Sequence, residues 1–224
     1  MDAPDPTPAG RSRVPESAQT GPHEQLPALI ARRAGQPFRQ PVAPYSREAF
    51  ESFAAGCAPD TPLIIDSCCG VGESTARLAE SFPDHVVLGV DQSADRLARA
   101  PALPANARLL RADMADIWRL LLDGGYRPAR QYMLYPNPWP KIGHLARRWP
   151  AHPVFPTVLA LGGRIECRSN WRIYVEECVL AAKLIAGIDA AVEAFSPAMP
   201  LTPFERKYAA SGHALYRCLL EAAT

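Results

Sequence analysis

The chain has 224 residues, of which 48% are hydrophobic and 21% are charged, and its formal net charge at pH 7 is +1. This length excludes two full enzyme domains, because a single hydrophobic core stops growing near ~250–300 residues. The apolar stretches end well short of the ~20 residues that a membrane-spanning helix needs, which excludes an integral membrane protein. The first twenty residues contain no apolar block typical of a secretory signal, so we expect a globular protein of the cytoplasm.

The cysteines indicate neither a metal site nor a disulfide framework. No Cys-x-x-Cys pair occurs, and no histidine stands at metal-ligand spacing from a cysteine. We expect reduced and mostly buried thiols at Cys57, Cys68, Cys69, Cys167, Cys178 and Cys218.

The N-terminal part of the chain differs in composition from the rest. Nine of the 24 prolines lie in the first 45 positions, among residues with few large apolar side chains. Such a segment buries too little apolar surface to offset the loss of chain entropy on folding. We predict a disordered tail over residues 1–25, a partly ordered basic lead-in over 26–45, and one folded domain over 46–224.

Positive charge is concentrated in one stretch. From Gly124 to Arg164 there is no Asp or Glu, and the stretch carries a charge of +6. The basic residues are Arg127, Arg130, Lys141, Arg147, Arg148 and Arg164. A basic block on a nearly neutral protein indicates one face that binds a polyanion, although a solvated helix face is an alternative.

From residue 46 onward, short apolar runs alternate with helical segments, which is the βαβ pattern of a parallel sheet. Strands are predicted at 63–65, 86–90, 107–110, 132–135 and 163–167, and helices at 46–53, 73–81, 94–99, 114–122 and 171–185. The segments 191–195 and 214–220 are predicted to close the sheet as an antiparallel pair. The expected fold class is therefore α/β, with a mostly parallel seven-stranded sheet and helices on both faces.

Polar residues stand at or just after the carboxyl ends of the predicted strands, where open parallel sheets bind their ligands. They are Asp66, Asp91, Asp113, Asn137 and Asn170. The first predicted strand is followed by a loop that contains Gly70 and Gly72, and glycines let a ligand approach the backbone closely. Thr75 replaces the third glycine of a dinucleotide-binding loop, so the spacing suits a nucleoside without a pyrophosphate.

The three carboxylates near this loop suggest the ligand. Asp91 can accept from both hydroxyls of a ribose, Asp113 from an adenine amino group, and Asp66 can face a cationic amine. Together these groups describe S-adenosylmethionine; a nicotinamide enzyme and a packing turn without ligand remain alternatives. The loop resembles the first motif of class I S-adenosylmethionine-dependent methyltransferases, acid-x-Gly-x-Gly-x-Gly, with Cys68 in place of the first glycine.

The most specific string in the chain is Tyr-Pro-Asn-Pro-Trp-Pro-Lys, which ends at Lys141. Its three prolines fix the backbone, so Asn137 and Trp139 would be held over the methyl group of the cofactor before the substrate arrives. An amide and an aromatic ring on a rigid turn suit a flat heterocycle, and Arg147 and Arg148 follow closely enough to meet phosphates. The alternative is a proline turn whose tryptophan only covers the edge of the sheet.

This string resembles the signature of the tRNA guanine-N7 methyltransferase family, Pro-Asp-Pro-Trp-x-Lys-x-x-His-x-x-Arg-Arg. A segment around Asn170 resembles the family's Thr-Asp-Trp-x-x-Tyr, and a segment that begins at Thr202 resembles its Thr-x-Phe-Glu. The resemblance covers about residues 46–220. It implies a Rossmann-like class I methyltransferase that transfers a methyl group from S-adenosylmethionine to N7 of a guanine in tRNA.

The two loops and the resemblance together assign the site residues, and no metal is expected among them. Cofactor binding would fall to Asp66, Gly70, Gly72, Asp91, Asp113 and Asn137, of which Asn137 would also be the catalytic residue. The tRNA or its target base would meet Trp139, Lys141, Arg147, Arg148, Asn170, Thr202 and Glu205.

Asn137 and Asn170 stand where the family usually has Asp. Guanine N7 is an exposed lone pair, so its methylation needs positioning and in-line approach rather than a general base. A carboxylate is an ideal acceptor for the N1–H and amino group of guanine, whereas an asparagine offers one acceptor and one donor. Two alternatives therefore stay open: a diverged paralogue that methylates another acceptor, such as an exocyclic amine, and a noncatalytic RNA-binding protein on the same scaffold.

Overall fold

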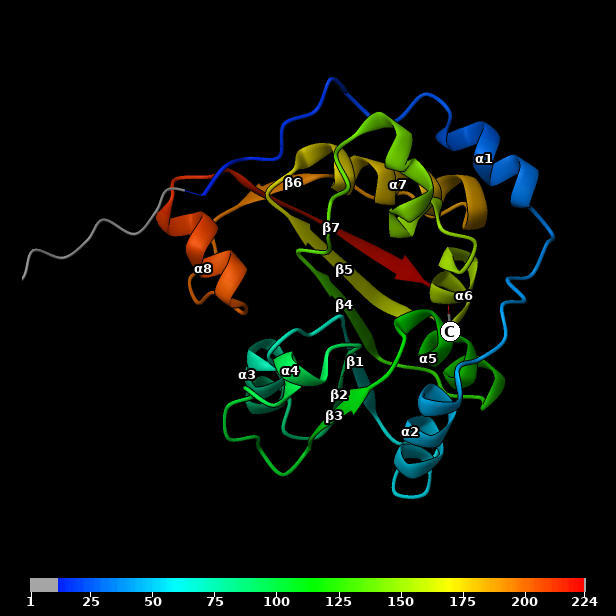
Figure 1. Ribbon diagram of the computed structural model, residues 1–224, viewed down its shortest axis with the longest axis vertical. Helices are drawn as coiled ribbons and strands as arrows, with labels where there is room; N and C mark the ends of the chain where they lie inside the picture. The colour runs from blue at the N-terminus through cyan, green and yellow to red at the C-terminus, as the bar shows by residue number, and fades with distance from the viewer. Residues whose placement is uncertain (1–11, 224) are drawn as a thin grey trace, which may run out of the picture.

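A seven-stranded sheet forms the centre of the computed structural model, which describes residues 12–223 (Figure 1). Its strands stand in the order β3-β2-β1-β4-β5-β7-β6. Their bounds are β1 Leu63–Ser67, β2 Val86–Asp91, β3 Ala107–Arg111, β4 Arg130–Leu134, β5 Gly163–Ser169, β6 Glu193–Phe195 and β7 Leu215–Ala222. The first five strands pair in parallel, whereas β7 pairs antiparallel with β5 and β6, which confirms the predicted fold class.

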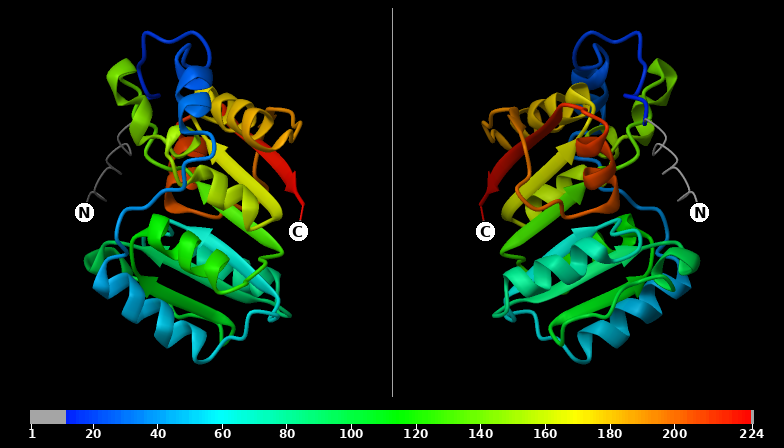
Figure 2. Two further views of the ribbon diagram at one scale, coloured as in Figure 1. Left: turned by 90° about the vertical axis from the view of Figure 1, so that its right-hand side faces the viewer. Right: turned by 90° about the vertical axis from the view of Figure 1, so that its left-hand side faces the viewer.

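Helices cover both faces of the sheet (Figure 2). The α-helices are α1 Leu26–Arg33, α2 Pro44–Ala54, α3 Glu73–Ser81, α4 Ala94–Leu97, α5 Met114–Asp123, α6 Phe155–Ala160, α7 Arg172–Ala186 and α8 Pro203–Ala210, and the 3-10 helices are η1 Ile142–Arg147 and η2 Trp149–Ala151. Strand alternation separates two cores: Leu63 and Ile65 pack with residues of α5 and α7, and Ile64 packs with Leu78 of α3. None of the helices within residues 12–223 combines the length and the apolar character needed to span a membrane.

The close packing of α3 on β2 depends on Gly89. A β-carbon at this position would lie 2.2 Å from Oγ1 of Thr75 and 2.7 Å from a methyl carbon of Leu109. No side chain fits there, so the glycine lets the first turn of α3 lie against the sheet, next to the loop that follows β1.

The segment from Ser12 to Gln25 packs against the body of the protein, which differs from the expected disordered tail. The Ser17 hydroxyl donates to a backbone carbonyl at 2.7 Å, and the backbone N–H of His23 donates to the Glu177 carboxylate at 3.0 Å. These contacts are polar and long-range, so a composition poor in apolar side chains does not reveal them. Residues 1–11 of the expected tail lie outside the described residues.

The expected lead-in over residues 26–45 contains α1 and the start of α2. Leu26 is fully buried in a small apolar cluster with Leu145 and Ala151, and α1 packs against α7. The lead-in is thus part of the folded body, because one apolar side chain of α1 finds a site between η1 and η2.

Candidate active site at the carboxyl edge of the sheet

The loop between β1 and α3 lies at the carboxyl edge of the sheet and is tied to β2. The backbone N–H of Cys69 donates to the carbonyl of Val90 at 2.9 Å. Gly70 and Gly72 have φ angles of +63° and +75°, in the left-handed region that side-chain-bearing residues rarely adopt. This conformation explains why glycines occur at these two positions.

Asp66 is buried beneath the loop, with 1% of its surface exposed. Its Oδ2 accepts hydrogen bonds from the hydroxyls of Ser74 at 2.6 Å and Thr75 at 2.7 Å, which ties β1 to the start of α3. Its Oδ1 is buried and has no partner among residues 12–223. Burial raises the pKa of Asp66 to about 6, against the opposing effect of the two hydroxyls. An unpartnered buried carboxylate oxygen fits a cationic group of a ligand.

Asp91 ends β2 and orders the backbone around it. Its Oδ2 accepts from the Gly70 N–H at 3.0 Å and from the Arg96 guanidinium at 3.1 Å, and its Oδ1 accepts from the Ser93 N–H at 2.8 Å. The Arg96 side chain is 55% exposed, so it can move aside at little cost in desolvation. The carboxylate then keeps acceptor sites for two further hydroxyl donors.

Asp113 is the N-cap of α5, with its Oδ1 accepting from the Ala115 N–H at 2.8 Å. Its Oδ2 accepts from the side-chain amide of Gln92, which directly follows Asp91. Its own N–H donates to the Ser46 hydroxyl at 3.1 Å. The sequence reasoning did not name Gln92, although a polar residue next to an acidic strand end is a usable signal.

Cys68 occupies a left-handed conformation with φ of 58°, at the position where the motif usually has glycine. Desolvation by the surrounding protein and, to a smaller extent, the carboxylates of Asp91, Asp113 and Asp66 together raise the pKa of its thiol to about 12. The side chain reaches the surface but remains a neutral thiol at physiological pH, and thiols are far weaker nucleophiles than thiolates.

The turn after β4 contains two further left-handed residues, Tyr135 with φ of 52° and Trp139 with φ of 45°. Each such conformation costs of order 1–3 kcal/mol and persists only where the surroundings fix it. Asn137 is exposed at the middle of this turn, and its Oδ1 accepts from the Trp139 N–H at 3.2 Å. Because that backbone group can only donate, it fixes which end of the Asn137 amide is the oxygen, and the amide nitrogen stays free to donate to a ligand.

Glu205 braces the first end of this turn. It is fully buried, and its Oε1 accepts from the Tyr135 hydroxyl and from Arg168, both at 2.9 Å. Its Oε2 accepts from the Leu201 N–H at 2.6 Å, while the Thr202 hydroxyl caps α8 by accepting from the Glu205 N–H at 3.0 Å. The prediction that Thr202 and Glu205 contact the tRNA does not fit this arrangement, because both side chains are buried and used within the protein.

Arg148 braces the other end. It is fully buried and forms an ion pair with Glu177 at 2.5 Å. Its Nε and Nη2 donate to the Trp139 carbonyl at 3.1 and 3.0 Å, and Nη2 also donates to Gln19 at 2.7 Å. The expected phosphate contact of Arg148 is therefore corrected: this guanidinium holds the turn against α7 and does not reach the surface.

The neighbouring basic residues are accessible. Arg147 and Lys141 are exposed, and the Arg147 guanidinium lies over the Trp139 ring, 4.7 Å from its centroid. The indole is half-buried, so one part of the ring and two cations face outward beside Asn137.

Asn170 lies just beyond β5 and is 6% exposed. Its amide nitrogen lies 3.1 Å from Nδ1 of His213, whose ring stacks on Tyr208 with 5.3 Å between centroids and 10° between planes. No motif in the sequence points to His213, which is 43 positions away from its partner.

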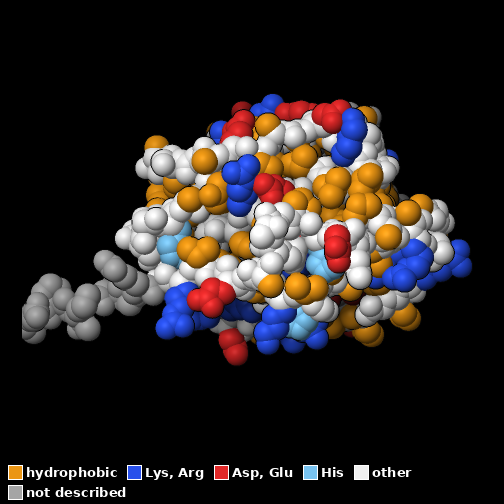
Figure 3. Space-filling model, turned by 90° about the horizontal axis from the view of Figure 1, so that it is seen from above, with side chains coloured by type: hydrophobic (Ala, Val, Ile, Leu, Met, Phe, Trp, Pro, Cys, Tyr) orange, Lys and Arg blue, Asp and Glu red, His pale blue; other side chains and the backbone are white. Residues whose placement is uncertain are grey.

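The stretch without acidic residues does not form one face. Arg127, Arg130 and Arg164 lie at the amino ends of β4 and β5, and Arg164 pairs with Glu221 at 2.6 Å. With Arg148 buried, only two of its six cations, Lys141 and Arg147, stand at the carboxyl edge. Figure 3 looks down on the end of the molecule with η1 and α7 and shows basic side chains gathered in several groups along the lower and right-hand margin.

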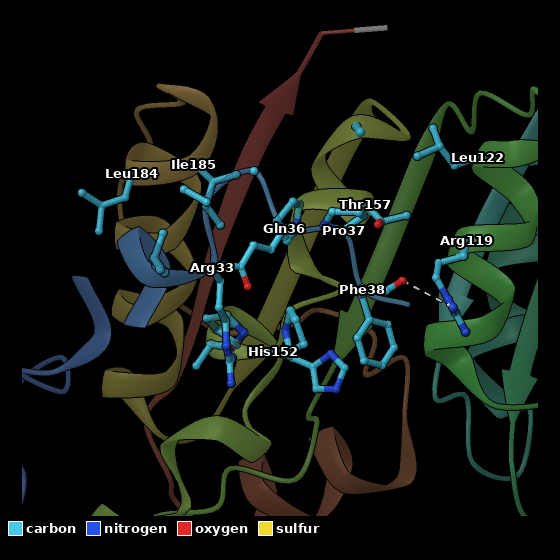
Figure 4. Close-up of a pocket in the computed structure, with 18 of the residues that line it drawn as sticks. Arg33, Gln36, Pro37, Phe38, Arg119, Leu122, His152, Thr157, Leu184 and Ile185 are labelled. Atoms are coloured by element: carbon cyan, nitrogen blue, oxygen red, sulfur yellow. Dashed lines mark hydrogen bonds between the residues drawn. The ribbon is translucent and has the colours of Figure 1, made fainter. Parts of the chain in front are cut away.

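A cavity of about 710 Å³ lies elsewhere, between α5, α6, α7 and the segment after α1 (Figure 4). Its lining includes Phe38, Arg119, His152 and Ile185, and none of the predicted site residues. The ring of His152 packs edge-on against Phe38, and burial lowers its pKa to about 4. Among residues 12–223, no group of three or more His, Cys, Asp or Glu side chains is placed to hold a metal ion.

Comparison with known proteins identifies the family. The model of a family described as "Putative methyltransferase" matches residues 60–218. A tRNA (guanine-N(7)-)-methyltransferase of Nocardioides sp. is 33% identical over 175 residues, which are 72% of this chain and 68% of that protein. The chain belongs to the tRNA (guanine-N7)-methyltransferase family. It is therefore an S-adenosylmethionine-dependent methyltransferase, which confirms the cofactor and the enzyme class predicted from the sequence.

A further relative agrees with this assignment, and solved structures share the fold. The tRNA (guanine-N(7)-)-methyltransferase of Treponema pallidum is 28% identical over 174 residues, 74% of this chain and 69% of that protein. The 16S rRNA methyltransferase KamB is similar in structure, with a TM-score of 0.53, 17% identity, and coverage of 82% of this chain and 96% of that one. The antibiotic-resistance methyltransferase Kmr has a TM-score of 0.51 and 17% identity, covering 84% and 98% of the two chains. At these identities the two structures support the fold alone.

Removing the buried charge of Arg148 tests whether its ion pair with Glu177 stabilises the protein. We expect Arg148→Met to lower the free energy of unfolding by about 3–5 kcal/mol, because Glu177 would stay buried without a counter-charge. Arg147→Met, the matched change at the exposed neighbour, should cost no more than ~0.5 kcal/mol. Equilibrium unfolding in urea measures both, and equal effects of the two substitutions would contradict the buried position of Arg148.

Proposed function

We propose that this protein transfers the methyl group of S-adenosylmethionine to N7 of a guanine in tRNA. The observation that carries the proposal is a set of polar groups at the carboxyl ends of four neighbouring strands. Asp66 belongs to β1, Asp91 to β2, Asp113 to the end of β3 and the Asn137 turn to the end of β4. Family membership supports the reaction, since the relatives it matches are named for the same chemistry.

The three carboxylates suit the three polar parts of the cofactor. The unpartnered Oδ1 of Asp66 is available to the cationic amine. Asp91 would accept from the ribose hydroxyls once Arg96 moves aside, and Asp113, at the neighbouring strand end beside Gln92, would meet the adenine edge. When bound, S-adenosylmethionine supplies an electrophilic methyl group on a sulfonium centre.

The chain's own contribution to the reaction is positioning. Held by Asp66, Asp91 and Asp113, S-adenosylmethionine would supply the methyl group; the N7 lone pair would form the new N–C bond as the S–C bond breaks, and the positive charge would pass from the sulfonium to the guanine ring. No proton moves, and no general base is needed. The amide nitrogen of Asn137 can donate to O6 of the guanine, which lies next to N7, and the Trp139 ring offers a surface for the base.

Lys141 and Arg147 are the exposed cations beside the turn and are proposed to meet tRNA phosphates. Arg148, Thr202 and Glu205 are proposed to act indirectly, by fixing the turn from within the protein. A second candidate, methylation of a different RNA acceptor, is favoured by the presence of Asn rather than Asp at positions 137 and 170.

One assay separates these candidates. Incubation with tRNA lacking 7-methylguanosine and labelled S-adenosylmethionine should place the label in 7-methylguanosine after nuclease digestion. Label in another nucleoside would favour the second candidate, and binding of S-adenosylhomocysteine without any RNA methylation would reject both.

The pKa of Asp66 predicts a pH dependence of cofactor binding. The cationic amine binds the ionised carboxylate, so protonation of Asp66 opposes binding. We expect the affinity for S-adenosylhomocysteine to be constant above pH 7 and to fall toward tenfold per pH unit below about pH 6. Calorimetry between pH 5 and pH 8 measures this. The decline should disappear in Asp66→Asn and persist in Asp113→Asn; a decline that persists in Asp66→Asn would refute the assignment.

The two exposed cations predict the salt dependence of RNA binding. Arg147→Gln and Lys141→Gln should each lower tRNA affinity several-fold and reduce the slope of log Kd against log salt by about 1, because each removes one phosphate contact. Arg127→Gln is the matched control, since it belongs to the same acid-free stretch but lies at the amino edge. Filter binding at several salt concentrations checks the difference, and an equal loss in Arg127→Gln would show that phosphate binding is not confined to the carboxyl edge.

A further inference from the structure

We propose that His213 is a positioning residue that fixes the side-chain amide of Asn170 in one orientation, so that its Oδ1 faces the target guanine as a hydrogen-bond acceptor. The proposal rests on the proposed function, because it concerns how the same site holds its base. It answers a question raised by the sequence: how an asparagine can serve where the family has an acceptor-only carboxylate.

Asn170 is placed beside the turn from Tyr135 to Trp139 that follows β4, here called the methylation turn. Strands β4 and β5 pair in parallel, and the N–H of Tyr135 donates to the carbonyl of Arg168 at 2.9 Å. Asn137 and Asn170 each follow these paired residues by two positions. The two asparagines therefore leave adjacent strand ends, at the edge where the base must be held.

The environment of His213 determines its tautomer. Its Nε2 lies 2.8 Å from the backbone carbonyl oxygen of Ser12, and a carbonyl oxygen can only accept. Nε2 must therefore carry the proton. In a neutral ring with hydrogen on Nε2, the other nitrogen, Nδ1, is an acceptor.

The tautomer in turn determines the orientation of Asn170. Nδ1 of His213 lies 3.1 Å from the Asn170 amide, and only the amide nitrogen can donate to it. Oδ1 of Asn170 accepts no hydrogen bond from residues 12–223, which leaves this oxygen available as an acceptor. The hydrogen-bond partner therefore determines which end of the Asn170 amide is the nitrogen and which is the oxygen.

An outward acceptor is the group that guanine requires on this side. The Watson–Crick edge of guanine presents two donors, N1–H and the amino group, whereas the opposite edge presents N7 and O6 as acceptors. The Asn137 amide nitrogen suits O6, and an oriented Asn170 oxygen suits N1–H or the amino group. A carboxylate would serve in any orientation, but an amide serves only if something prevents it from turning.

The surroundings of His213 keep the ring in place. It stacks on Tyr208, and the Tyr208 ring in turn lies 5.6 Å from the Tyr135 ring at the start of the methylation turn. An imidazole can accept on one side and donate on the other, and a phenyl ring of similar shape can do neither. His213→Phe therefore removes the orienting hydrogen bond while it preserves the stacking.

The test is a double-mutant cycle at pH 8 with unmodified tRNA. We expect His213→Phe to raise the KM for tRNA about five- to tenfold, the size of one lost hydrogen bond, with the affinity for S-adenosylhomocysteine unchanged. In the background of Asn170→Asp, the same change at His213 should alter the KM less than twofold, because a carboxylate needs no orientation. Thermal unfolding of all four proteins confirms that each is folded.

Two outcomes would overturn the inference: an unchanged KM in His213→Phe, or a loss of the same size in both backgrounds, which would indicate a purely structural role. Failure of the wild-type protein to form 7-methylguanosine is a separate result and would reject the proposed function itself. If His213→Phe does not fold, His213→Asn replaces it, since its side-chain oxygen can accept from Asn170; this variant should retain the wild-type KM, and a tenfold increase would contradict the proposal.

Discussion

Two buried carboxylates, Glu177 and Glu205, hold the turn that follows β4 in a conformation it would not adopt alone. Buried charges are tolerated only with well-placed partners, so each of these groups dictates the position of the cation and the hydroxyl or carbonyl around it. Glu177 fixes Arg148 and through it the Trp139 carbonyl, and Glu205 fixes Tyr135. The left-handed backbone at both ends of the turn is the local cost, and the fixed position of Asn137 beyond β4, the neighbour of β1 in the sheet, is its consequence.

The positions of the strands along the chain could be predicted because the apolar runs are short, alternate with helical segments and are followed by polar residues. Several helices were missed for one reason: α1, α6 and α8 are short and have a proline in their first turn. Proline lacks the N–H that a helix leaves unbonded at that position, so it suits a helix start, yet in a sequence it also indicates a loop. The packed N-terminal segment was missed because hydrogen bonds such as that of His23 to Glu177 leave no pattern in the local sequence.

In the candidate site, too, some features could be predicted from the sequence and others could not. Asp66, Asp91 and Asp113 could be located from the sequence, since topology alone brings strand ends together. The sequence did not predict whether a given side chain faces solvent or the interior. Arg147 and Arg148 are adjacent and chemically identical, but one faces solvent and the other is buried on Glu177 because the end of η1 turns there. The motif therefore predicted which residues belong to this turn, but it did not distinguish the exposed residues from those that hold the turn from within the protein.

The two asparagines also change the electrostatics of the site. Three carboxylates already stand at this edge, and two more would increase the repulsion of an RNA backbone, which Lys141 and Arg147 oppose beside the turn and Arg96 opposes beside Asp91. Amides remove that repulsion but lose the attraction that a carboxylate offers to the cationic methylated base. They also acquire a direction, which a carboxylate does not have. In this chain each amide receives that direction from a fixed partner, the Trp139 backbone for Asn137 and His213 for Asn170. Under the proposed function, the surrounding protein thus determines which end of each amide the base would meet.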